Sequence, residues 1–186
     1  MQRLSDIALI AQVVTLGSER AFEQLVRAHQ KAVRRFLRRL TAGDEMRADD
    51  LSQETFIRAW QHLSDFRQLS GFETWLLRIA YRVFLDDERK QSPLDNAIDP
   101  ADDSNSALSK GKEGGVSESF SLHYDLDQAL YTLSETELTC VVLQCVEGQS
   151  IREIAQIMSL PENTVKSHLL RGKKNLASYL RRNGYG

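Results

Sequence analysis

The sequence predicts an all-α protein built from two small helical domains, and three observations support this fold class. Apolar residues recur at intervals of three and four, whereas the alternation typical of strands is almost absent. This periodicity stops over residues 91–122, which separates residues 1–90 from residues 123–186. Residues 150–180 have the pattern of a helix-turn-helix. We therefore expect two helical domains joined by a flexible acidic linker, with the helix-turn-helix in the second.

Helix boundaries follow from the apolar periodicity and from the residues that interrupt it. Glycines and Pro161 mark several interruptions. Two capping boxes precede apolar runs, and they pair Ser134 with Glu137 and Ser150 with Glu153. The expected helices span residues 5–16, 19–41, 48–63, 71–90, 124–132, 135–147, 151–158 and 162–182.

The segment 91–122 has the composition of a linker. Pro93, Pro100, three glycines and several serines replace the helical pattern. Such a segment cannot bury enough apolar surface to offset the chain entropy lost on folding. We therefore expect it to be flexible and to divide the chain into a domain at 1–90 and a domain at 123–186.

Charge is unevenly distributed along the chain. The 186 residues have a net charge of −2, so the whole molecule is not a general polyanion binder. Residues 31–39 nevertheless hold five basic residues and no acid, and the chain from Glu162 onward has a net charge of +5. Residues 91–127, between them, have a net charge of −6. Two basic helical segments around an acidic spacer indicate two separate contacts with a polyanion.

The predicted helix at 48–63 has an unusual outer face. Its inner face carries residues such as Phe56 and Ala59, which recur at helical spacing. The opposite face is polar and acidic but includes an apolar isoleucine, so a partner that covers it is one interpretation. A solvated face with one stray apolar residue is the alternative. The residues that we assign to this face are Asp50, Gln53, Glu54 and Ile57.

The predicted helix at 71–90 and the loop before it carry a second candidate surface. On the helix, a basic face with one aromatic residue suits phosphates and unpaired bases, although a solvated charged face is equally compatible with the pattern. Trp75 is expected on the opposite, inward face as a core anchor. The loop adds an aromatic residue and an arginine. The candidate contacts are Phe66, Arg67, Arg78, Tyr81 and Arg82.

The predicted helix-turn-helix carries the third candidate surface. On its second helix, Val165, Leu169 and Leu176 belong to an inward stripe. The outward side mixes hydrogen-bonding and cationic side chains near the helix N-terminus, where a helix that enters the major groove needs them. An ordinary helical hairpin with a basic surface is the alternative. The outward candidates are Asn163, Lys166, Ser167, Leu170 and Arg171.

Signatures of catalysis, cofactor binding and membrane insertion are missing from the sequence. It contains no phosphate-binding loop, nucleophile elbow, zinc-protease motif or dinucleotide fingerprint. Cys140 and Cys145 form no metal-ligand pattern with the scattered histidines, and we interpret them as small apolar helix residues. No apolar run is long enough to span a membrane. We expect a cytoplasmic protein that is not an enzyme and binds no metal or other cofactor.

Three motifs in the first domain and one in the second resemble extracytoplasmic-function (ECF) sigma factors. AFEQLVRAHQKAVRRFLRRL, DDLSQETFIRAWQHLSDFR and FETWLLRIAYRVFLDDERK resemble their second domain. LSETELTCVVLQCVEGQSIREIAQIMSLPENTVKSHLLRGKKNLASYL resembles their fourth domain. The resemblance implies a transcription initiation factor that binds core RNA polymerase and promoter DNA, with an anti-sigma factor as a regulatory partner.

The resemblance also implies a role for each candidate surface. The face with Asp50, Gln53, Glu54 and Ile57 would bind core polymerase. The segment 66–82 would melt and recognise the minus-ten element, and the outward side of the helix from Glu162 would recognise the minus-thirty-five element. The linker would be disordered in the free protein and ordered in the holoenzyme.

One departure and one rival family qualify the resemblance. Arg82 stands where the family often has asparagine, which affects the expected minus-ten preference. A LuxR-type response regulator has a similar helix-turn-helix, but it needs a receiver domain with alternating strands and helices, and residues 1–90 show no strand pattern. A purely structural helical adaptor is a third class, distinguished by the absence of any promoter dependence.

Overall fold

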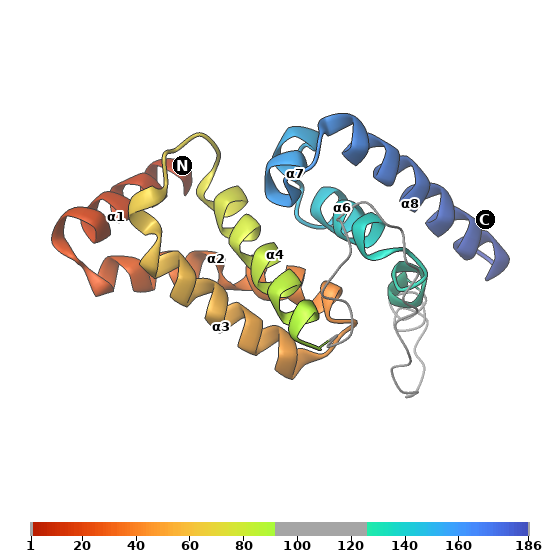
Figure 1. The fold of residues 1–186 in the computed structure, drawn as a ribbon, viewed down its shortest axis with the longest axis horizontal. Coiled ribbons are helices and arrows are strands. Elements are labelled where there is room, and N and C mark those ends of the chain that lie inside the picture. Colours follow the sequence, from red (N-terminus) through yellow and green to blue (C-terminus); the bar gives the residue numbers. More distant parts are fainter. Residues whose placement is uncertain (1, 92–125, 186) are drawn as a thin grey trace. The chain divides into compact units, whose positions relative to one another are not determined.

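The computed structural model describes residues 2–91 and 126–185, with side chains from residue 5 onward. Every regular element in these residues is helical, as predicted. The helices belong to two compact units (Figure 1). The first contains α1 to α4, and the second contains α6, α8 and residues 151–155 of α7. The predicted linker at 91–122 lies outside the described residues except for residue 91, which ends α4.

The first unit is a bundle in which α2 is the central helix. It packs against α1, α3 and α4, and α3 also packs against α4. Its elements are α1 (Gln2–Leu16), α2 (Glu19–Leu40), α3 (Glu45–Gln61), the 3-10 turn η1 (Leu63–Asp65) and α4 (Phe72–Gln91). The largest fully buried side chains are Leu25, Val33, Phe36, Leu37, Leu40, Leu76 and Leu77.

Side-chain caps determine where two of these helices begin. Ser18 Oγ accepts a hydrogen bond from the Ala21 N–H at 3.2 Å, and α2 begins at the expected residue. Asp44 caps α3 through the Arg47 N–H at 3.0 Å. The prediction that this helix begins at residue 48 is therefore wrong by one turn, because the aspartate was interpreted as part of the preceding break.

The buried surface of α4 is wider than the sequence pattern predicts. Leu77 and Phe84 are buried in addition to Phe72, Leu76, Ala80 and Val83, since the helix packs against both α2 and α3. Trp75, which was expected on the inward face, is only half-buried. Tyr81 was expected on an exposed face, but it is only 7% exposed. The tyrosine was misassigned because its ring is largely apolar although its hydroxyl is polar.

The second unit contains the helix-turn-helix. Residues 126–130 are helical, and α6 (Glu135–Cys145), α7 (Ile151–Met158) and α8 (Glu162–Arg182) follow. The capping box at α7 is complete, because the Ser150 N–H donates to the Glu153 carboxylate at 2.9 Å and the Glu153 N–H donates to Ser150 Oγ at 3.3 Å. Its core includes Leu138, Val142, Leu143, Ile154 and Val165.

The two cysteines of α6 have different environments. Cys140 is buried and Cys145 is exposed. Burial, together with the charge of Glu137, raises the pKa of the Cys140 thiol to about 12. Within the described residues no cluster of potential ligands could hold a metal ion. None of the described helices is both long enough and apolar enough to cross a membrane.

Candidate protein and nucleic-acid interfaces

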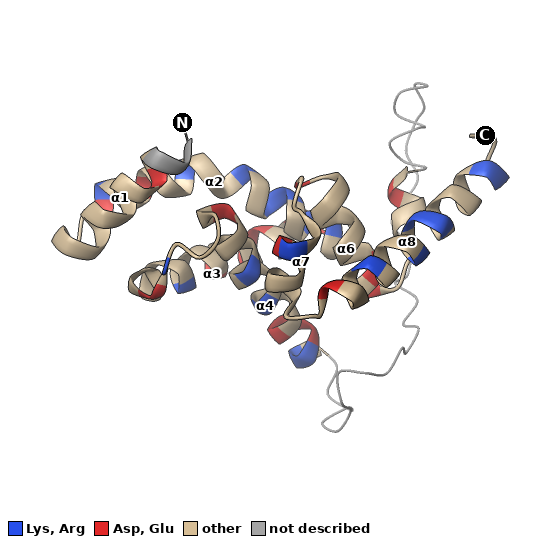
Figure 2. Ribbon diagram, turned by 90° about the horizontal axis from the view of Figure 1, so that it is seen from above, with Lys and Arg blue, Asp and Glu red and all other residues tan. Residues whose placement is uncertain are grey.

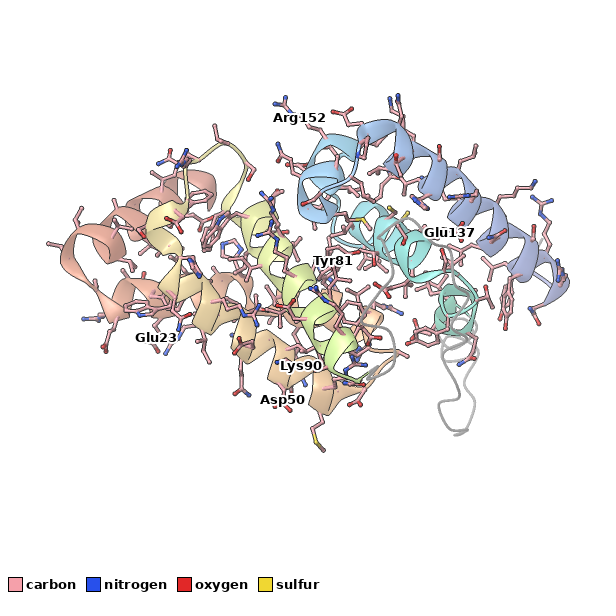
Figure 3. The ribbon with its side chains drawn as sticks, viewed as in Figure 1. Glu23, Asp50, Tyr81, Lys90, Glu137 and Arg152 are labelled. Carbon is pink, nitrogen blue, oxygen red and sulfur yellow. The ribbon has the colours of Figure 1, made fainter. Side chains whose placement is uncertain are left out.

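The outer face of α3 is polar with an exposed apolar residue, as the sequence predicts. Ile57 is 53% exposed, and Asp50 and Gln53 are exposed beside it. Figure 3 shows Asp50 projecting from the outer side of α3. Next to this face, α2 and α3 enclose a shallow groove of about 730 Å³ whose apolar lining includes Val26, Phe56 and Ile57. The face therefore has an apolar centre with a polar surround, which is the usual composition of a protein-binding surface.

Glu54 differs from the other residues of this face because it is also part of an ion-pair network. Its carboxylate accepts a hydrogen bond from Arg58 Nε at 2.7 Å, and Arg58 Nη1 donates to Asp86 of α4 at 2.7 Å. Hydrogen bonding to Arg58 lowers the pKa of Asp86. Glu54 thus helps to orient the arginine that joins α3 to α4, and a substitution there would perturb this ion pair as well as the surface.

The loop between η1 and α4 is anchored by an aromatic cluster. The ring of Phe66 lies 5.6 Å from that of Phe72 and 5.5 Å from that of Trp75, measured between centroids. Phe66 and Trp75 are both half-buried. Trp75, expected as a core anchor, therefore keeps part of its ring at the surface beside the loop. Arg67, the next loop residue, is exposed.

Trp75 and Arg82 line a common cavity of about 300 Å³ within the first unit. The other lining residues are Arg58, His62, Asp65 and Ile79. Pattern analysis missed His62 and Asp65 as neighbours of this cavity, because they come from the end of α3 and from η1. An arginine beside an indole and a carboxylate offers stacking, charge and hydrogen bonding to a planar polar ligand such as a base.

Arg78 and Arg82 are separated by one turn of α4. Arg82 is exposed and Arg78 is half-buried. Burial and the charge of Arg82 lower the pKa of Arg78. An anion between them would relieve this repulsion. Tyr81, predicted with them, is buried, so at most a small part of its surface is available to a ligand.

The outward side of α8 is exposed at all five predicted positions. Asn163, Lys166, Ser167, Leu170 and Arg171 are exposed, and Leu170 is 73% exposed. The opposite stripe is buried at Val165, Leu169 and Gly172. Figure 2 shows lysines and arginines recurring along α8. The helix thus has the division into a buried and a cationic side that major-groove binding requires.

Comparison with known proteins decides the family. The Sigma-70 region 2 family matches residues 25–93, and the Sigma-70 region 4 family matches residues 123–176. The ECF RNA polymerase sigma-E factor of Escherichia coli K12 is 31% identical over 93% of this chain and 93% of its own length. This chain belongs to the ECF family of RNA polymerase sigma factors.

Other relatives agree with this assignment. The sigma factor SigW of Bacillus subtilis is 29% identical over 90% of this chain and 93% of its own. SigE of Mycolicibacterium smegmatis is 33% identical, and this chain spans 62% of its length. The match of residues 25–93 to region 2 excludes the LuxR-type alternative, because a receiver domain would have to occupy that part of the chain.

Two solved structures share the fold of this sigma factor. CnrH, solved with the cytosolic domain of CnrY, aligns with a TM-score of 0.71 at 25% identity over 97% of this chain and 99% of its own. RpoE of Bartonella quintana, solved with the anti-sigma factor NepR, aligns with a TM-score of 0.67 at 24% identity over 86% of this chain and 96% of its own.

Proposed function

We propose that residues 1–90 of this sigma factor bind core RNA polymerase and the minus-ten element, and that residues 123–186 bind the minus-thirty-five element. The protein acts in the cytoplasm, catalyses no reaction itself and gives polymerase its promoter specificity. The observation that carries this proposal is the exposure of all five outward residues of α8 opposite a buried stripe. A helix of this kind presents hydrogen-bonding and cationic groups to base edges and phosphates together.

The minus-ten contacts are assigned to the loop after η1 and to α4. An extruded base loses a few kcal/mol of stacking, so the protein must offer a replacement surface. The cavity beside Trp75 and Arg82 offers such a surface, and Phe66 supports it from the aromatic cluster. Arg67 and Arg78 are suited to the flanking phosphates, and Tyr81 supports the site mainly from within.

The polymerase contact is assigned to the outer face of α3. Ile57→Lys should weaken core binding by roughly 2–5 kcal/mol, because it places a charge in a surface that becomes desolvated on binding. The fold should survive, since Ile57 is more than half exposed. Competition for core polymerase against labelled wild-type protein measures the effect. Leu16→Lys, at a position that is 77% exposed at the end of α1, is the matched control.

Glu54→Lys is a less specific test than Ile57→Lys, because it also removes a partner of Arg58. If Ile57→Lys and Leu16→Lys both compete as well as wild type, the polymerase contact lies elsewhere on the first domain.

We also propose an anti-sigma factor as the regulatory partner. One similar structure was solved with the anti-sigma factor NepR, and another with the cytosolic domain of CnrY. The exposed apolar residues Ile57 and Leu170, on the two candidate interfaces, are suited to the apolar contacts of such a partner. Co-expression of this chain with candidate binding domains and assay of promoter-dependent transcription tests the proposal, which predicts inhibition.

A further inference from the structure

Helices α6 and α8 approach each other closely at Gly172. A Cβ atom at this position would lie 2.9 Å from Val141 Cγ2 and 3.5 Å from Glu137 Cβ. Because a side chain at 172 would separate the helices, the glycine allows the side chains of α6 to reach the neighbouring residues of α8. Glu137 is the residue of α6 that uses this proximity, and Figure 3 shows it at the side of α6 next to α8.

The Glu137 carboxylate is directed toward α8. The backbone N–H of Glu137 donates to Ser134 Oγ at 3.4 Å, which caps α6. In a complete capping box, the Glu137 carboxylate would in turn accept a hydrogen bond from the backbone N–H of Ser134. Instead, Oε2 accepts a hydrogen bond from Asn175 Nδ2 at 3.4 Å, and Oε1 lies 3.4 Å from Arg171 Nε. Glu137 is only 8% exposed, so its charge needs these partners.

Arg171 is held from a second direction. Its Nη2 lies 3.1 Å from Nδ1 of His168, one turn earlier on α8. Since a guanidinium can only donate, this ring nitrogen is the acceptor. The contacts of Nε with Glu137 and of Nη2 with His168 together fix the orientation of the guanidinium group. A guanidinium has five N–H donors, so the same group can hold both partners and still donate to a phosphate.

The position of Arg171 around α8 determines what it can reach. At 100° per residue, Ser167 and Leu170 lie within roughly 40° of Asn163, and these three residues form the centre of the outward side. Lys166 and Arg171 lie at its two opposite edges, roughly 60° and 80° from Asn163, and Arg171 is on the edge that faces the Glu137 contact. A long side chain that lies at this edge and is held toward α6 would point to the rim of the DNA major groove, where the phosphates lie. It would not point to the floor of the groove, where the base edges lie.

We propose that Glu137 is a positioning residue that holds Arg171 on the α6 side of α8, where Arg171 binds a DNA backbone phosphate beside the upstream promoter element. This inference rests on the proposed function of the second domain. It distinguishes Arg171, which fixes the register of the helix on the duplex, from Asn163, Ser167 and Leu170, which face the bases.

The test is a double-mutant cycle on reconstituted holoenzyme. The variants are Glu137→Ala, Arg171→Ala and the combination, with Glu137→Gln as a variant of the same shape that can keep one hydrogen bond. Glu135→Ala removes the same charge from the same turn of α6 and is the matched control. The probe is a promoter fragment selected by wild-type holoenzyme from a library with a randomised upstream element. Binding is measured at several salt concentrations, and thermal melting verifies the fold.

Arg171→Ala should weaken binding to all upstream sequences by the same factor and reduce the salt slope by about 0.9, the value for one phosphate. Glu137→Ala should weaken binding about five-fold, as expected for loss of one net hydrogen bond. Glu137→Gln should be intermediate, and Glu135→Ala should not weaken binding. In the Arg171→Ala background, the effect of Glu137→Ala should vanish. Removal of an acid that merely repels DNA would instead strengthen binding in both backgrounds.

Three results would overturn the inference. The first is that a folded Glu137→Ala protein binds the promoter as well as or better than wild type. The second is that Glu137→Ala changes binding equally in the wild-type and Arg171→Ala backgrounds. The third is that Arg171→Ala alters the base preference at one position. If wild-type holoenzyme shows no dependence on any upstream element, the proposed function of the second domain fails. If that dependence is present without coupling between the two residues, only the role of Glu137 fails.

Discussion

His29 is a buried titratable side chain of the first unit that lies between two carboxylates. It is 2% exposed, with Nε2 3.2 Å from Asp6 of α1 and Nδ1 3.7 Å from Glu73 of α4. Burial opposes its charge, but the carboxylates of Glu73 and Asp6 outweigh burial and raise the pKa of the imidazole. The ring of Phe72 lies 5.2 Å away, edge to face. A protonated His29 therefore ties α1 and α4 to α2.

This geometry predicts a pH-dependent contribution of His29 to stability. Because the folded-state pKa is above the ordinary value of 6.5, the contribution is complete below pH 6.5 and is lost as the pH rises through the raised pKa. His29→Gln should lower the free energy of unfolding by about 1.5 kcal/mol or more at pH 5.5 and by less at pH 8.5. Denaturant unfolding at the two pH values measures this difference.

His62→Gln is the control, since His62 is exposed and its contact with Asp65 at 3.3 Å is solvated. A pH-independent effect of His29→Gln would show that the imidazole contributes through packing alone.

At the scale of single residues, the sequence predicts which side chains are exposed better than it predicts which side chains contact each other. The five outward positions of α8 are confirmed as exposed, because helical periodicity alone determines them. The contacts of His29 with Asp6 and Glu73 join residues of three different helices, and no local pattern contains that information. Tyr81 was misassigned because a pattern of polar and apolar residues must count each residue as one or the other, whereas the tyrosine side chain is both.

At the scale of elements, caps and close contacts explain the lengths and crossings of the helices. The break before α8 was predicted from Pro161, and α8 begins at Glu162 as expected. The beginning of α3 was predicted one turn too late, because Asp44 was not interpreted as its cap. Arg47 then joins α3 to α4 through Asp87, with Nε and Oδ2 2.8 Å apart. Ion pairs between helices of this kind cannot be predicted from either helix separately.

The close crossing of α6 and α8 predicts a specific sensitivity at Gly172. Gly172→Val should lower the free energy of unfolding by about 1–3 kcal/mol, because the added side chain would overlap Val141, whose own side chain is short and stiff. Thermal or denaturant unfolding measures the loss. Lys173→Val introduces the same residue at the exposed neighbouring position and controls for helix propensity. Equal losses in the two variants would mean that the crossing tolerates a side chain.

At the scale of the whole molecule, each of the two units has a core of its own. Phe36 and Leu76 belong to the core of the first unit, whereas Leu143 and Val165 belong to that of the second. The fold class and the division into helical units could be predicted because both depend on periodicity and composition. The cavity beside Trp75 and Arg82 could not, because it is formed by α3, η1 and α4 together.

Separate cores predict that the two proposed functions, polymerase binding and recognition of the upstream element, can be separated. A fragment of residues 1–91 should be helical and should bind core polymerase within about ten-fold of the full chain, because the proposed contact lies on α3. It should lose any dependence on the upstream promoter element, since α8 is missing. Circular dichroism and competition for core polymerase test the first expectation, and transcription from promoters with altered upstream elements tests the second. A folded fragment that does not bind polymerase would contradict the assignment of the contact to the first domain.

The central claim is that this chain gives core RNA polymerase its promoter specificity. Run-off transcription on a genomic library, with core polymerase alone and with the purified full-length chain added, tests it most directly once the start sites are sequenced. The account predicts that the chain produces new start sites preceded by a common minus-ten and a common minus-thirty-five element at fixed spacing. Start sites that are the same with and without the chain, or new start sites that share no upstream sequence, would contradict it.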